Sequence, residues 1–112
     1  MIDAAVAQIA SDLRELLLPD CPAHAAFVGR LGQSVAERDF PTAVRLFSSL
    51  DMWGGSGSIA DISLPTPAAN EKMNELLMQL VKHFGDAGIA YPRATTWVSV
   101  FEEWQAQGIF RE

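Results

Sequence analysis

The apolar residues between Met73 and Phe84 follow the spacing of a helix without a fault. Counted from Met73, they stand at i, i+3, i+4, i+7, i+8 and i+11, which places them on one face of a helix. Pro67 suits the first position of such a helix, and Gly85 or Gly88 suits its end. The spacing predicts a long amphipathic helix that buries one face against a helical domain.

Similar spacing recurs in four other stretches. Apolar steps of three and four residues predict helices over residues 2–18, 22–38, about 41–50 and 95–107. The third of these has Asp39-Phe40-Pro41 as its start signal. Gly29 and Gly32 indicate close approach of a neighbouring helix, because each costs about 1 kcal/mol relative to alanine within a helix. Ile109 and Phe110 are expected to fold back as an apolar tail. With 49% hydrophobic and 20% charged residues, the composition is that of a globular chain, and we expect residues 1–112 to form one all-α domain of about five helices.

Residues 53–61, Trp-Gly-Gly-Ser-Gly-Ser-Ile-Ala-Asp, do not fit a helix, and we call them the glycine loop. Three glycines within four positions favour a sharp turn or a close contact, since glycine tolerates positive φ. The loop lacks the lysine of a phosphate-binding loop, the second glycine of a nucleophile elbow around Ser56 and the βαβ unit of a dinucleotide site. Two interpretations remain: a tight connector with Trp53 and Ile59 in the core, or a rigid contact surface with Trp53 as its anchor.

The chain is acidic, since 14 Asp and Glu against 8 Lys and Arg give a net charge of −6. Proteins that bind nucleic acids or anionic membranes present basic patches, so we expect neither partner. The charge favours a basic protein as partner, and it is equally explained by solubility alone.

Three features indicate a cytoplasmic protein. The longest apolar run, residues 16–18, is far below the ~20 residues of a membrane span. Residues 1–3 lack the basic start of a signal peptide. Cys21 is the single cysteine and has no partner for an internal disulfide, which agrees with a reducing compartment.

The side chains do not form a recognisable catalytic or metal-binding motif. His24 and His83 lack the spacing of a metal-binding pair, so we expect no metal and no cofactor. Glu102 and Glu103 point about 100° apart on a helix and do not form a paired acid–base site. Ser56 or Ser58 with His83 and Asp61 would make a triad only if the fold brought them together, because triads are defined by geometry.

The stretch from Trp53 to Ile62, followed by the leucine-rich helix from Asn74 to Val81, resembles a group of small uncharacterised bacterial proteins. In that group, an aromatic-Gly-Gly-x-Gly-Ser-x-x-Asp-aliphatic motif precedes a helix of the Asn-x-x-Leu-x-x-Leu type. The resemblance covers about residues 45–85 and implies no established activity. The size, acidity and helical pattern are also similar to those of bacterial immunity proteins, which neutralise antibacterial toxins by binding them in the cytoplasm.

These patterns together predict a non-enzymatic binding protein, most specifically an immunity protein with a basic toxin as its partner. Its expected contact residues are Asp51, Trp53, Ser56, Asp61, Glu102 and Glu103. The carboxylates would meet a basic surface and Trp53 would serve as apolar anchor. The alternatives are a structural or regulatory subunit that docks through an apolar helix face, and a small hydrolase that uses a serine of the glycine loop. The sequence leaves open whether the chain is a monomer or a dimer.

Overall fold

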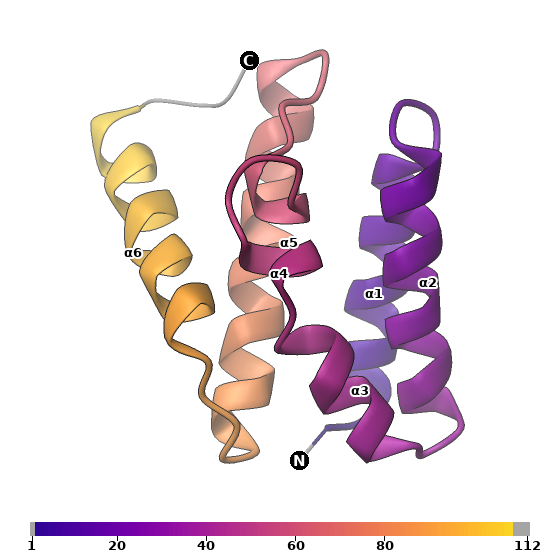
Figure 1. Cartoon of the computed structure of the whole chain (residues 1–112). Helices are drawn as coiled ribbons and strands as arrows, with labels where there is room; N and C mark the ends of the chain where they lie inside the picture. Colours follow the sequence, from indigo (N-terminus) through magenta and orange to yellow (C-terminus); the bar gives the residue numbers. More distant parts are fainter. Residues whose placement is uncertain (1, 109–112) are drawn as a thin grey trace.

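The computed structural model describes residues 2–108 of the chain, and helices account for most of them (Figure 1). The helical elements are α1 (Ala4–Leu17), α2 (Pro22–Ala36), α3 (Phe40–Phe47), α4 (Leu50–Trp53), the 3-10 turn η1 (Ile59–Asp61), α5 (Pro67–Asp86) and α6 (Pro92–Gln107). No strand occurs within residues 2–108. The expected all-α fold with five main helices is therefore confirmed, with α4 and η1 as additional single turns. Ile109 and Phe110 lie outside the described residues.

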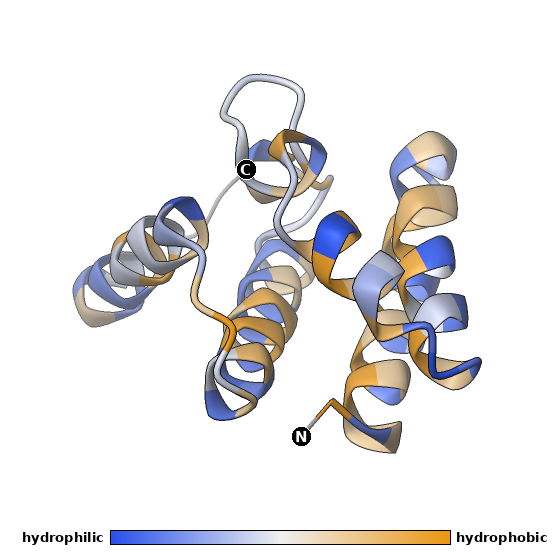
Figure 2. Ribbon diagram, turned by 60° about the horizontal axis from the view of Figure 1, so that its bottom comes forward, coloured by the Kyte–Doolittle hydropathy of each residue, from blue (hydrophilic) through white to orange (hydrophobic). Residues whose placement is uncertain are grey.

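The helix α5 lies between the α1–α2 pair on one side and α6 on the other (Figure 1). Hydrophobic and hydrophilic residues alternate along the long helices, as expected for amphipathic helices (Figure 2). The predicted apolar face of α5 is buried at Met73, Leu76, Leu77, Leu80 and Phe84. None of the helices within residues 2–108 has both the length and the apolar character to span a membrane.

Helices α1 and α2 pack closely through small residues, as the two glycines of α2 predicted. A Cβ atom placed on Gly32 would lie 3.1 Å from the Cβ of Ala10, and one on Gly29 would lie 3.2 Å from the Cδ of Arg14. Such distances leave little or no room for a larger side chain. The glycines therefore allow the close approach of the two helices.

The predicted third helix starts where the Asp39-Phe40-Pro41 signal places it, but its predicted end at residue 50 is wrong. The helix α3 begins at Phe40 and ends at Phe47, and α4 starts as a separate turn at Leu50. At the break, the Ser49 hydroxyl donates a hydrogen bond to the carbonyl oxygen of Leu46 at 2.7 Å. Serine hydroxyls compete with helical hydrogen bonds in this way, which separates the two helices.

The predicted start of the last helix, at Thr95, is also three residues late. The helix α6 begins at Pro92, and the hydroxyls of Thr95 and Thr96 donate back to the carbonyl oxygens of Tyr91 and Pro92. They therefore do not cap the helix. Proline has no backbone N–H and suits the first helical position, so Pro92 marks the start.

A buried asparagine connects α5 to the segment before it. The side chain of Asn70 accepts a hydrogen bond from the Leu64 N–H at 2.7 Å and donates to the carbonyl oxygens of Leu64 and Thr66 at 2.9 and 2.8 Å. This side chain holds residues 64–66, which follow the glycine loop, against the first turn of α5.

Candidate functional site

Trp53 fixes the glycine loop at its root. Its side chain is 1% exposed, and its indole N–H donates to the carbonyl oxygen of Phe47 at 2.8 Å. The carbonyl oxygen of Trp53 accepts a hydrogen bond from the indole N–H of Trp97 on α6 at 3.1 Å. The expectation that Trp53 is a surface anchor is therefore wrong, because its ring is not accessible. The prediction that Trp53 and Ile59 lie in the core is confirmed. A contact role for the exposed residues of the loop stays a prediction.

The ring of Trp53 completes an aromatic group in the core. It meets the ring of Phe47 edge-on, with centroids 5.8 Å apart. Phe47 in turn stacks on Phe84 of α5, with centroids 4.0 Å apart. The root of the glycine loop is thus joined to the central helix through two aromatic contacts.

The glycine loop is also fixed at its tip, by a histidine from α2. The Nε2 atom of His24 lies 2.9 Å from the carbonyl oxygen of Gly57, and a carbonyl oxygen only accepts, so this nitrogen carries the donated proton. Gly55 and Gly57 have φ angles of 96° and 85°, which explains why glycines stand there. The sequence held no signal for this contact, which joins two residues 33 positions apart.

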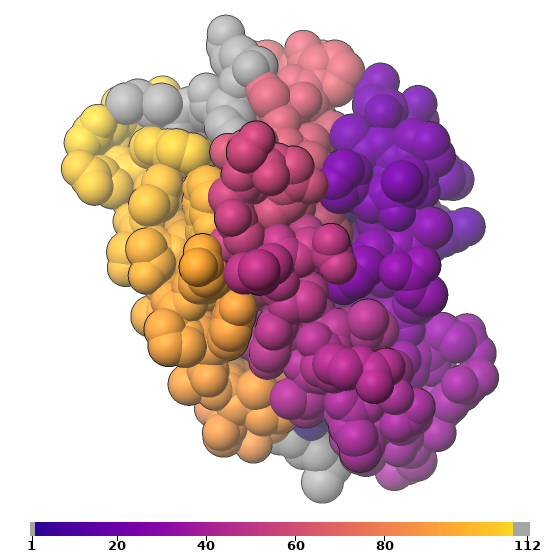
Figure 3. All heavy atoms as spheres, viewed as in Figure 1, coloured from indigo at the N-terminus to yellow at the C-terminus, as the bar shows by residue number. Residues whose placement is uncertain are grey.

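Three of the predicted contact residues are exposed on or beside the glycine loop: Asp51, Ser56 and Asp61. The segment that carries them lies on one face of the molecule, between α6 and the α1–α2 pair (Figure 3). Glu102 and Glu103 are also exposed, on the C-terminal half of α6. Glu102 and Glu103 do not line the two surface concavities beside the loop, which are described below.

The spacing of apolar residues did not indicate that Leu50, which lies directly beside Asp51, is a surface residue. Its side chain is 60% exposed, on the first position of the single-turn helix α4. Leu50 and Trp53 are both apolar and three residues apart, so spacing alone does not show which one is buried. The indole N–H of Trp53 has a partner in the core, and Leu50 is left as the apolar side chain on the surface.

The first concavity lies between α2 and the glycine loop, and we call it the α2 cleft. It measures about 230 Å³ and is lined by Ala23, His24, Phe27, Arg30, Asp51, Gly57 and Ile59. The guanidinium of Arg30 lies 5.2 Å from the ring centroid of Phe27, a cation–π contact. The cleft thus places a cation, an imidazole and a carboxylate around one small space.

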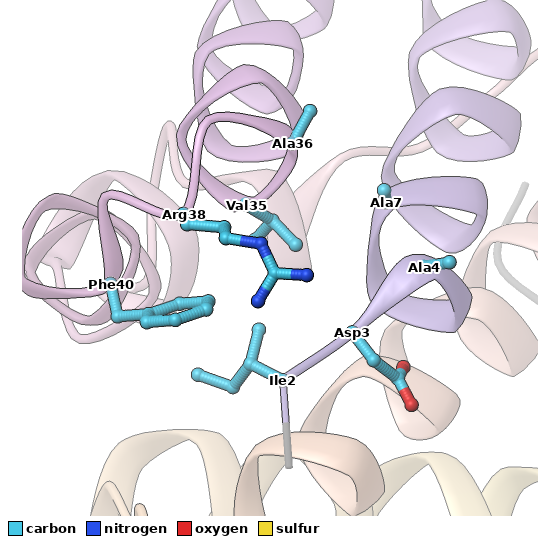
Figure 4. A pocket seen from close by; sticks show the side chains of 8 residues that line it. All are labelled: Ile2, Asp3, Ala4, Ala7, Val35, Ala36, Arg38 and Phe40. Atoms are coloured by element: carbon cyan, nitrogen blue, oxygen red, sulfur yellow. The ribbon is translucent and has the colours of Figure 1, made fainter.

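The second concavity lies between the glycine loop and α6, and we call it the α6 groove. It measures about 420 Å³ and is lined by Trp53, Gly55, Arg93, Thr96, Trp97 and Val100. A third, of about 320 Å³, lies between the start of α1 and the end of α2, where the guanidinium of Arg38 extends between Phe40, Val35 and Ile2 (Figure 4). None of the predicted contact residues lines this third concavity.

The structure does not assemble the triad that the hydrolase alternative requires. The Ser58 hydroxyl is buried and has no hydrogen-bond partner, so it is not hydrogen-bonded to His83. Ser56 is exposed, and no hydrogen bond within residues 2–108 joins it to a histidine. A nucleophilic serine needs a base within hydrogen-bond reach. The same residues hold no group of three or more His, Cys, Asp or Glu side chains that is placed to bind a metal ion.

Cys21 is the residue before α2 and is half-buried. Burial raises the pKa of its thiol above the ordinary value, and the neighbouring Asp20 carboxylate raises it further. The thiolate is the reactive form of cysteine, so this side chain is not an activated nucleophile at neutral pH.

No protein-family model, curated protein or solved structure matches the chain. The resemblances drawn from the glycine motif and from the acidic helical pattern therefore remain predictions.

Proposed function

We propose that this chain is a non-enzymatic binding protein that recognises another protein through the face carrying the glycine loop. One observation supports this most directly: the loop is held at its root and at its tip, while Leu50, Asp51 and Ser56 stay exposed. A contact surface that is ordered before binding loses less conformational entropy when the partner arrives. The buried residues of this segment stabilise the fold, and the exposed residues are the ones that the proposal assigns to partner binding.

In its most specific form, the proposal is a bacterial immunity protein that occludes an antibacterial toxin in the cytoplasm. The net charge of −6 and the exposed carboxylates of Asp51, Asp61, Glu102 and Glu103 favour a basic partner. Such complementarity speeds association and selects the partner. Leu50 takes the place of Trp53 as the apolar anchor, because hot spots of interfaces combine an apolar contact with surrounding polar groups.

The outer helix α6 supports the alternative of a subunit that docks through an apolar helix face. Only Ala94 and Phe101 of α6 are fully buried, while Trp97 and Trp104 are half-buried. A partner on α6 would cover more of these rings. This alternative predicts a stable oligomer or an obligate complex, whereas an immunity protein is expected to be stable by itself before it meets the toxin.

The decisive experiment uses a basic toxin encoded beside the gene for this chain. Wild-type protein is expected to rescue cells that express the toxin and to bind it in calorimetry. The variant Leu50→Ala, Asp51→Asn, Asp61→Asn is expected to lose rescue and most of the affinity. The matched control is Leu18→Ala, Asp20→Asn, Glu37→Gln, which changes an exposed large apolar side chain and two exposed carboxylates outside the segment 50–61.

The outcomes separate the proposals. Equal loss in both variants would show a general charge effect and would refute recognition by the loop face. Unchanged rescue in the loop variant, with loss after Trp104→Ala, would move the interface to α6. A homo-oligomer in light scattering, together with no affinity for the toxin, would favour the subunit alternative.

A further inference from the structure

The α6 groove is open to solvent and has the volume and the mostly apolar lining of a small-ligand site. Its volume of about 420 Å³ lies within the range of roughly 300–1,000 Å³ that is usual for ligand pockets. The indole of Trp97 and the side chain of Val100 are only half-buried, so part of the apolar lining faces the groove. Such sites combine apolar walls with one or two polar groups that orient the ligand.

The polar group of this groove is a cation. Arg93 is the charged side chain of its lining, and it forms no ion pair with any other residue of the described range 2–108. Among the basic side chains of residues 2–108, Lys82 alone forms an ion pair, so the relevance of Arg93 comes from its place in the same lining as Trp97 and Val100. A guanidinium presents several donors in a planar fork that fits a carboxylate.

The start of α6 strengthens the positive potential at the same end of the groove. Arg93 is the second residue of α6, and the residue before the helix, Tyr91, provides no side-chain hydrogen bond to its first turn. The first turn also contains no acidic residue. The cap residue and the first turn of α6 therefore do not compensate the positive end of the helix dipole. An anion beside Arg93 would be stabilised by the guanidinium and by this helix end.

The opposite wall is built by the glycine loop. The carbonyl oxygen of Trp53 is bonded to the Trp97 indole N–H at 3.1 Å, which fixes the loop against α6. A Cβ atom on Gly55 would find no heavy atom within 4 Å, so the space beside this residue is open. The groove is thus held in shape by a hydrogen bond while its interior stays unfilled.

We propose that the α6 groove binds a small organic carboxylate, with its aromatic or aliphatic group against Trp97 and Val100 and its carboxylate on Arg93. The ligand is a small molecule, and its site is separate from the residues proposed to meet a protein partner. This inference does not depend on the proposed immunity function, because purified protein alone suffices to test it.

The test is an NMR titration of the full chain with 3-phenylpropionate and, as neutral counterpart, 3-phenylpropan-1-ol. The carboxylate is expected to shift the indole N–H of Trp97 and the amide of Gly55 in a saturable way. Arg93→Gln is expected to weaken its binding about tenfold, the effect of losing one charge-assisted hydrogen bond, and to change the affinity of the alcohol less than twofold.

Two controls keep the result specific. Arg45→Gln removes an equal charge from an exposed arginine that lines a different concavity, and it is expected to leave both affinities unchanged. Val100→Phe fills the groove and is expected to abolish the shifts from both compounds. Equal binding of acid and alcohol, no saturable shift up to about 10 mM, or equal effects of the two arginine variants would each overturn the proposal.

Discussion

Replacing Asn70 by alanine tests whether one side chain holds the segment between the glycine loop and α5. The Asn70 side chain is completely buried and makes three hydrogen bonds to the backbone of Leu64 and Thr66. Each such bond contributes about 1 kcal/mol net, and a buried group left without a partner costs more. We therefore expect Asn70→Ala to lower the free energy of unfolding by about 3–4 kcal/mol, a large part of the roughly 5–15 kcal/mol of a typical domain.

Urea unfolding followed by circular dichroism measures this loss. If the free energy of unfolding falls by about 1.5 kcal/mol per molar urea, as is usual for small proteins, the urea midpoint should decrease by about 2–2.7 M. The control is Gln79→Ala, on an exposed position of the same helix, which should change the stability by less than about 0.5 kcal/mol.

A loss below about 1 kcal/mol in Asn70→Ala would refute the reasoning, since it would mean that water replaces the side chain at Leu64 and Thr66 without penalty. A change in the slope of the unfolding free energy against urea concentration would show that the mutation alters the compactness of the folded or the unfolded state. The midpoint alone would then not measure the lost hydrogen bonds.

Three further predictions concern glycines and the cysteine. Gly85→Ala should raise the stability by about 0.5–1 kcal/mol, because Gly85 lies inside a helix and its added Cβ would meet nothing within 4 Å. Gly88→Ala should lower the stability by about 1 kcal/mol, because Gly88 has a φ of 85°. Thermal unfolding measures both changes. Gly32→Val should lower the stability by about 2 kcal/mol, since the new side chain would press on Ala10, and a stability equal to wild type would show that α1 moves aside freely. Cys21 should react with iodoacetamide at pH 8 more slowly than free cysteine, because burial raises its pKa, and unfolding should remove the difference.

The helices of this chain were predictable because their apolar residues repeat at a helical period. The face of α5 and the small residues between α1 and α2 follow directly from the sequence. The break between α3 and α4 was not predictable, because residues 43–50 keep a helical spacing across it. There, the Ser49 hydroxyl donates a hydrogen bond to the carbonyl oxygen of Leu46. The spacing of apolar residues does not reveal such a side-chain hydrogen bond.

The candidate site was predictable only in part. Asp51, Ser56 and Asp61 are exposed as expected, since charged and polar side chains avoid burial without partners. The contacts of His24 and Asn70 depend on which backbone groups the fold brings beside them. Each is polar and stands in a helix, and the spacing of apolar residues holds no information about such partners.

Trp53 is a buried apolar residue of the glycine loop, and Leu50 beside it is the apolar residue proposed to contact a partner. Truncating a buried tryptophan to alanine costs about 3–5 kcal/mol, so Trp53→Ala should unfold or severely weaken the domain and would reveal nothing about binding. Leu50 is 60% exposed, and Leu50→Ala should change the stability by less than about 0.5 kcal/mol while removing the proposed anchor. A loss of partner affinity in Leu50→Ala at unchanged urea midpoint would therefore measure recognition alone. A fall in that midpoint comparable to the fall caused by Trp53→Ala would instead show that Leu50 supports the fold, and the proposed contact surface would lose its apolar residue.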